Sequence, residues 1–148
     1  MICVGIKTSD NIYFLGDSLF SEETIEKYSL FFIYDVREFI NTLNYLSTLN
    51  GSLYIPSHCE ATNDISSLIN INKNKVNEIM NKIYDVCEKE MTFEEILKYI
   101  LDEYNLILNT NQYVLVGSTI RSYISYLFDE NKLRYEFKDN KMLWKQVD

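Results

Sequence analysis

Two residues that follow apolar segments have side chains that could bind a metal ion. Asp17 comes after residues 12–15 and Gly16, and His58, the only histidine of the chain, comes after residues 54–57. A carboxylate and an imidazole at the ends of neighbouring strands are suitable ligands for a divalent transition metal. Because glycine lets the backbone bend, Gly16 could turn the carboxylate into such a site. Two ligands do not complete a zinc site, which needs at least three from the protein.

Each residue also has an ordinary structural interpretation. An aspartate after a strand commonly forms a turn or caps a helix, and a single histidine after a proline commonly lies at the surface. Cys59 and Glu60 follow His58 as possible additional ligands. Adjacent side chains on an extended segment point in opposite directions. We therefore do not expect His58 and Cys59 to bind one ion together.

The segment around Asp17 is predicted to begin with two short strands. Apolar residues alternate at the start of residues 1–16, and residues 9–11 (Ser-Asp-Asn) favour a turn between the strands. Residues 17–34 mix acidic and aromatic side chains without a clean period, which predicts a loop.

A helix and a further strand are predicted between the two candidate ligands. The capping box Asp35-x-x-Glu38 precedes apolar residues at helical spacing, and Asn50-Gly51 is expected to end this helix through a left-handed residue. Residues 53–55 predict a buried strand that is closed by Pro56. His58 would then follow the carboxyl end of a strand, where layered α/β proteins usually build their sites.

The second half of the chain is predicted to be helical and to end in a hairpin. Apolar residues at helical spacing mark a helix within residues 76–86, and the capping box Thr92-x-x-Glu95 opens another. A third helix is expected from roughly residue 118 to residue 128. Alternation in residues 133–137, followed by a turn and a return strand, predicts the hairpin. Helices followed by a hairpin have the outline of a winged helix.

The composition is that of an ordinary globular protein with an acidic balance. Hydrophobic residues make up 47%, and 14 basic against 22 acidic residues produce a formal net charge of -8. This charge disfavours binding to nucleic acids or anionic membranes, which depends on a positive field. No apolar run approaches the ~20 residues of a membrane span, and the three cysteines show no disulfide or metal spacing. We expect a cytoplasmic protein that binds neither nucleic acid nor membrane.

The order of these features resembles the second half of the metallo-β-lactamase superfamily. In that family one strand ends in a Gly-Asp pair whose carboxylate bridges two metal ions, and a later strand ends in a Pro-x-His segment whose histidine binds the second ion. Gly16-Asp17 and Pro56-Ser57-His58 match these segments. The resemblance implies an α+β fold with the C-terminal half of an αββα sandwich in residues 1–72. Residues 73–91 would be a connecting helix, and residues 92–148 a helical, winged-helix-like domain.

The resemblance also implies a metal-dependent hydrolase, in which Asp17 and His58 bind zinc or another divalent transition metal. The family's main ligand cluster, His-x-His-x-Asp-His, does not occur in this sequence. We therefore expect a C-terminal fragment of such a hydrolase with a partial metal site at most. The isolated chain should be inactive, because a metal held by too few ligands does not activate water. The loop 18–32 is the candidate wall of a substrate pocket, although its apolar residues Leu19, Phe20, Leu30 and Phe31 are expected to pack in the core.

Two further expectations concern partners. Half of a sandwich leaves one sheet face apolar and uncovered, so we expect the chain to self-associate through that face. The alternative function is a non-catalytic winged-helix module for interaction or dimerisation, which needs no metal. Metal content and oligomeric state together discriminate between the two functions.

Overall fold

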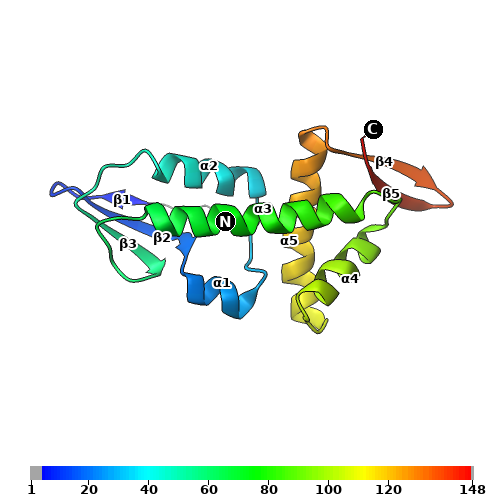
Figure 1. Cartoon of the computed structure of the whole chain (residues 1–148), viewed down its shortest axis with the longest axis horizontal. Coiled ribbons are helices and arrows are strands. Elements are labelled where there is room, and N and C mark those ends of the chain that lie inside the picture. Colours follow the sequence, from blue (N-terminus) through cyan, green and yellow to red (C-terminus); the bar gives the residue numbers. More distant parts are fainter. Residues whose placement is uncertain (1–4, 148) are drawn as a thin grey trace. The chain divides into compact units, whose positions relative to one another are not determined.

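The structure is a computed structural model that describes residues 5–147. Helices and strands are mixed along the chain, as the predicted α+β class requires (Figure 1). The first six elements are β1 (Ile6–Lys7), β2 (Ile12–Phe20), α1 (Glu22–Tyr28), α2 (Val36–Leu46), β3 (Leu53–His58) and α3 (Ser66–Val86). The last four are α4 (Phe93–Glu103), α5 (Thr110–Asp129), β4 (Leu133–Lys138) and β5 (Lys141–Gln146).

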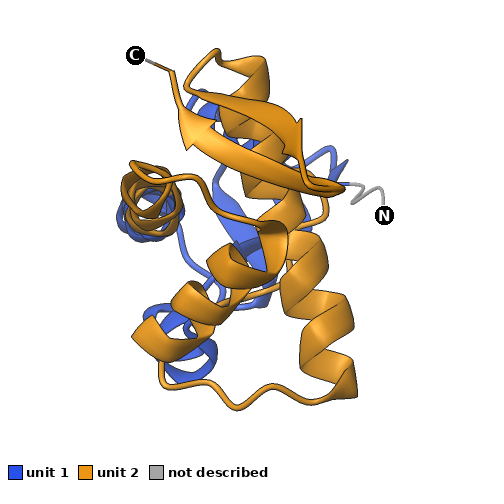
Figure 2. Cartoon of the chain, turned by 90° about the vertical axis from the view of Figure 1, so that its right-hand side faces the viewer, with its two compact units in different colours: residues 1–29, 37–76 blue, residues 30–36, 77–148 orange. Residues whose placement is uncertain are grey.

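The chain divides into two compact units, coloured blue and orange in Figure 2. The first unit comprises residues 1–29 and 37–76, and the second comprises residues 30–36 and 77–148. The long helix α3 contributes its first part to the first unit and its second part to the second. The strand predicted at the start of the chain falls partly on residues 1–4, which lie outside the described residues.

The sheet of the first unit has the strand order β1-β2-β3 within the described residues. β1 pairs antiparallel with β2, whereas β2 and β3 are parallel. The parallel register places Tyr13 beside Tyr54 and Phe20 beside His58, with irregularities on either side of Gly16. Because parallel strands end at the same edge of a sheet, this register brings the ends of β2 and β3 together.

The core of the first unit lies on one face of this sheet, against α2 and the start of α3. Its buried residues are Leu15, Leu19, Leu43, Leu46, Tyr54, Ile65 and Ile69. On the opposite face, Ile6, Phe14 and Ile55 are cross-strand neighbours in one row. Ile6 is 61% exposed and Phe14 is 44% exposed. As far as the structure describes the first unit, from residue 5 onward, this apolar face is therefore left uncovered.

The second unit is built around α4 and α5. Thr92 and Glu95 form the predicted capping box at the start of α4. The predicted apolar positions of both helices are buried: Ile96, Leu97, Ile100, Leu101, Val116, Ile120, Ile124 and Leu127. The hairpin is confirmed, and its turn residues Asp139 and Asn140 have φ of 51° and 59°, as a type I′ turn requires. No described helix combines the length and the apolar character needed to cross a membrane.

The loop predicted for residues 17–34 is wrong over much of its length. β2 continues to Phe20, and α1 follows with Ser21 as its N-cap, which accepts a hydrogen bond from the Thr24 N–H. Only Ile25 of α1 is buried. A helix of two turns with one buried residue leaves no measurable apolar period, which explains why periodicity did not indicate it.

Four other element boundaries differ from the prediction. α3 begins at Ser66, ten residues before the start of the helix predicted within residues 76–86. β3 runs through Pro56 to His58, which is possible because β3 is an edge strand and the missing proline N–H breaks no ladder. α2 ends at Leu46, and neither Asn50 nor Gly51 has a positive φ, so the predicted left-handed stop is wrong. α5 begins at Thr110, well before residue 118, because Asn109 caps it.

Candidate metal centre

Asp17 sits at an irregular point of β2. Gly16 has a φ of 57°, in the left-handed region that glycine enters without steric cost. The pairing of β2 with β3 shifts register on both sides of this glycine. The irregularity lies directly before the carboxylate, at the glycine where the sequence predicted a bend. It does not end the strand, because β2 continues for four residues beyond Gly16.

The structure brings the two predicted ligands together. His58 Nε2 lies 3.3 Å from Asp17 Oδ1, and the two side chains are 48% and 46% exposed. His58 is the last residue of β3, and Asp17 lies three residues before Phe20, the last residue of β2 and the register partner of His58. Both side chains are therefore partly open to the solvent.

The distance between these atoms is compatible with two interpretations. N–H···O hydrogen bonds in proteins are usually about 2.7–3.2 Å long, so 3.3 Å is long for a direct bond. Two ligand atoms that each lie about 2.0–2.1 Å from a tetrahedral zinc ion are about 3.3 Å from one another. The observed spacing therefore fits two ligands of one ion. As a half-exposed ion pair, the same contact would add little to stability.

The residues of the pair do not make a complete site. Within residues 5–147, no group of three or more His, Cys, Asp or Glu side chains is arranged to hold a metal ion. The donor types and their spacing fit a transition metal, but the number of donors is below the three that a zinc site needs.

Cys59 does not join the site. Its Sγ lies 3.7 Å from the carbonyl oxygen of Leu19, and its side chain packs against the core of the first unit. Burial raises the pKa of the Cys59 thiol, so the thiolate needed for metal binding is disfavoured. The opposite directions predicted for His58 and Cys59 are thus consistent with the structure.

The apolar residues of the loop 18–32 mostly pack in the interior. Leu19, Leu30 and Phe31 are buried, in agreement with the predicted core packing. Phe20 differs from them, because its ring stacks on the His58 imidazole with centroids 5.8 Å apart and planes 12° apart. The sequence did not indicate this contact, which depends on the register of β2 against β3. The role of this segment as a pocket wall stays a prediction.

The chain is similar in structure to solved proteins, although the sequence comparisons found no match. No protein-family model and no curated protein matches the chain. A Beta-lactamase domain protein from Burkholderia ambifaria is similar in structure over 97% of this chain, with a TM-score of 0.75 and 14% identity. A metallo-beta-lactamase family protein from Thermus thermophilus is similar over 93%, with a TM-score of 0.66 and 12% identity.

The chain spans less than half of either protein, 44% of the first and 42% of the second. At these identities the similarity concerns the fold and not the chemistry. The fold of this chain is similar to part of each of these two proteins, which agrees with the resemblance that the order of its sequence features indicated.

Proposed function

We propose that this chain contributes Asp17 and His58 to the metal site of a metallo-β-lactamase-like hydrolase. The supporting observation is that Asp17 Oδ1 and His58 Nε2 lie 3.3 Å apart, close enough for both to bind one ion. A second polypeptide segment supplies the remaining ligands, and the chain alone is inactive. The fold shared with part of a Beta-lactamase domain protein agrees with this division of the site.

The chemistry of such a site follows from its ligands. A bound divalent metal lowers the pKa of coordinated water and makes hydroxide available near neutral pH. Asp17 would hold the ion through the oxygen that faces His58, and His58 through Nε2. Both residues are fixed by β-strands rather than by loops, which gives the two donor atoms a defined separation.

A metal titration tests the ligand assignment. Zinc or Co²⁺ is titrated into the purified chain by calorimetry, and Co²⁺ binding is followed by its absorption spectrum. We expect weak binding at one site that is lost in Asp17→Asn and in His58→Gln. Glu60→Gln is the matched control, because it neutralises an exposed carboxylate two positions from His58. Equal binding by all four proteins would contradict the assignment.

An activity measurement tests the division of the site. The zinc-loaded chain should hydrolyse neither a lactam, nor a thioester, nor a phosphodiester, because two protein ligands do not hold a catalytic zinc ion. Hydrolysis by the chain alone that disappears in Asp17→Asn would show that the chain completes its own site, and would overturn this part of the proposal.

The second candidate function is a winged-helix-like interaction module in the second unit. It is favoured by an aromatic cluster on the hairpin, where Tyr135 contacts Phe128, Phe137 and Trp144 with ring centroids 5.5–5.7 Å apart. Phe137 is 74% exposed, so its ring is open to a partner. A dimer that forms without metal and dissociates in Phe137→Ser would support this module, whereas Phe137→Ser with unchanged assembly would count against it.

A further inference from the structure

We infer that Asn72 is a positioning residue for the candidate metal centre, acting through Phe20. Asn72 lies on α3, 52 positions after Phe20, and all residues involved belong to the first unit. The assignment of a metal-binding role rests on the proposed function, whereas the positioning of His58 itself does not require metal.

The side chain of Asn72 is fully buried and fully hydrogen-bonded. Its Nδ2 donates to the carbonyl oxygens of Phe20 and Leu68, each at 2.8 Å, and its Oδ1 accepts from the Phe20 N–H at 3.2 Å. The exposed fraction of the residue is 0%. A carboxamide offers two donors and one acceptor group, and all of them are used here. A buried amide with every group satisfied specifies one local geometry, because any alternative leaves polar atoms unpaired.

The two bonds to Phe20 replace the bonds of a neighbouring strand. In an antiparallel ladder, one residue exchanges both its N–H and its C=O with the residue opposite. Asn72 makes the same pair of bonds to Phe20 from a helix. Within the described residues, β1 pairs with β2 only at Tyr13 and Phe14, so no strand continues along that edge to Phe20. The two hydrogen bonds of the Asn72 amide therefore add to the pairing with β3 in holding the last residue of β2.

Phe20 transmits this constraint to the metal ligand. It is the register partner of His58, and its ring lies nearly parallel to the imidazole at 5.8 Å. Phe39 packs against Phe20 with centroids 6.3 Å apart, so the phenyl ring is held by a second contact. With one imidazole face against Phe20 and Nε2 directed at Asp17 Oδ1, the orientation of the His58 ring is determined from two sides.

The first test is a nuclear magnetic resonance measurement on the metal-free chain. His58 is the only histidine, so its two imidazole C–H signals are assigned without ambiguity. In the wild-type protein the Phe20 ring current should shift these signals upfield. Asn72→Ala and Phe20→Leu should both move these signals toward the positions of a free histidine. Phe20→Tyr keeps an aromatic ring at position 20 and should therefore keep the wild-type shift. Asn74→Ala, an exposed change on the same helix, should leave the signals unchanged.

Folding is checked separately from positioning. If Asn72→Ala does not fold, amide hydrogen exchange of the wild-type chain replaces it: the Phe20 N–H should exchange slowly although it lies at the end of its strand. The inference would be overturned if the His58 signals of a folded Asn72→Ala variant stayed at their wild-type positions. Fast exchange of the Phe20 N–H would also overturn it.

A second measurement separates this inference from the proposed function. Removal of groups that orient a metal ligand typically weakens metal affinity about 10- to 100-fold, so Asn72→Ala and Phe20→Leu should weaken Zn²⁺ binding on the order of tenfold. If wild-type chain binds no Zn²⁺ while the His58 signals respond as expected, the positioning role stands and the proposed function fails. If Zn²⁺ binding depends on Asp17 but is insensitive to both variants, the proposed function stands and Asn72 has no positioning role for the metal.

Discussion

Gly51 lies so close to Tyr13 that a Cβ atom at position 51 would stand 2.7 Å from Cδ2 of the tyrosine ring. The same Cβ would stand 3.0 Å from Cζ of Tyr54. The Gly51 N–H donates to the Tyr54 hydroxyl at 2.7 Å, and the hydroxyl donates to the Leu49 carbonyl at 3.0 Å. Glycine is thus required by close packing on two stacked tyrosines, not by a left-handed backbone.

Gly51→Ala should therefore destabilise the protein. Overpacking of this kind typically costs about 1–3 kcal/mol, and we expect a decrease of that size in the free energy of unfolding in urea. Gly117→Ala is the contrasting variant, because a Cβ there would meet its nearest neighbour, Arg121 Nη1, at 3.4 Å inside helix α5. It should be neutral or stabilise by up to about 1 kcal/mol through helix propensity. Equal effects of the two variants would contradict the packing argument.

The capping box of α4 predicts a pH-dependent contribution to stability. The Thr92 backbone N–H and hydroxyl both donate to Glu95 Oε2 at 2.7 Å, and these bonds lower the pKa of the Glu95 carboxyl. Because the folded-state pKa is depressed, the contribution is present above the unfolded-state pKa and is lost as the pH falls through the folded-state pKa. Thr92→Ala should cost about 1 kcal/mol at neutral pH.

Urea unfolding at neutral pH and at a pH below the Glu95 pKa measures this dependence. The difference between wild type and Thr92→Ala should shrink at the lower pH. A constant difference would mean that the carboxylate takes no part in the cap.

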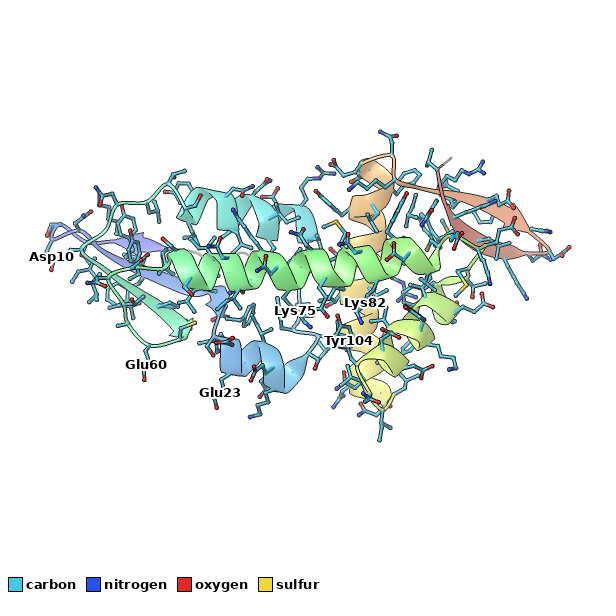
Figure 3. The ribbon with its side chains drawn as sticks, viewed as in Figure 1. Asp10, Glu23, Glu60, Lys75, Lys82 and Tyr104 are labelled. Carbon is cyan, nitrogen blue, oxygen red and sulfur yellow. The ribbon has the colours of Figure 1, made fainter. Side chains whose placement is uncertain are left out.

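Loss of the hydroxyl should change the free energy of unfolding differently at two tyrosines of the second unit. Tyr104 donates to Glu78 Oε1 at 2.7 Å and lies under Lys82, whose Nζ is 4.9 Å from the ring centroid (Figure 3). The hydroxyl of Tyr123 is buried without a hydrogen-bond partner among the described residues. Burial and the nearby Glu78 carboxylate raise the pKa of Tyr123 well above its ordinary range.

Tyr104→Phe should lower the free energy of unfolding by about 1 kcal/mol, the usual net value of a hydrogen bond. Tyr123→Phe should leave it unchanged or raise it, because the change removes a buried polar atom that makes no bond. Thermal and urea unfolding of the two variants compare them directly. A clear loss of stability in Tyr123→Phe would show that its hydroxyl has a partner in solution.

The uncovered sheet face of the first unit predicts self-association. Ile6 and Phe14 are exposed next to one another on this face, and a second copy presents the same apolar row. We expect light scattering at tens of micromolar to show a species larger than the monomer, and Phe14→Ser to shift it toward the monomer. Phe32→Ser is the control, since Phe32 is similarly exposed, at 40%, outside the sheet. A wild-type chain that is strictly monomeric would contradict the prediction.

Local sequence signals predicted much of the second half. The capping residues Thr92 and Glu95, the apolar period of α4 and the turn at Asp139-Asn140 act over a few neighbouring positions. Such interactions depend little on the rest of the chain, so the sequence reports them directly. The first half was predicted less well, since α1 buries a single residue and β3 contains a proline that an edge strand tolerates.

By itself, the sequence determined which residue types the candidate site contains: an aspartate directly after a glycine, and the only histidine of the chain directly after an apolar segment. Only the tertiary structure decided the distance between them, because the parallel register of β2 and β3 joins residues that are far apart in the chain. It also decided the roles of Phe20 and Asn72. A phenylalanine in an apolar run and an asparagine in a polar helix carry no distinctive signal until folding places their rings and amides in contact with a particular partner.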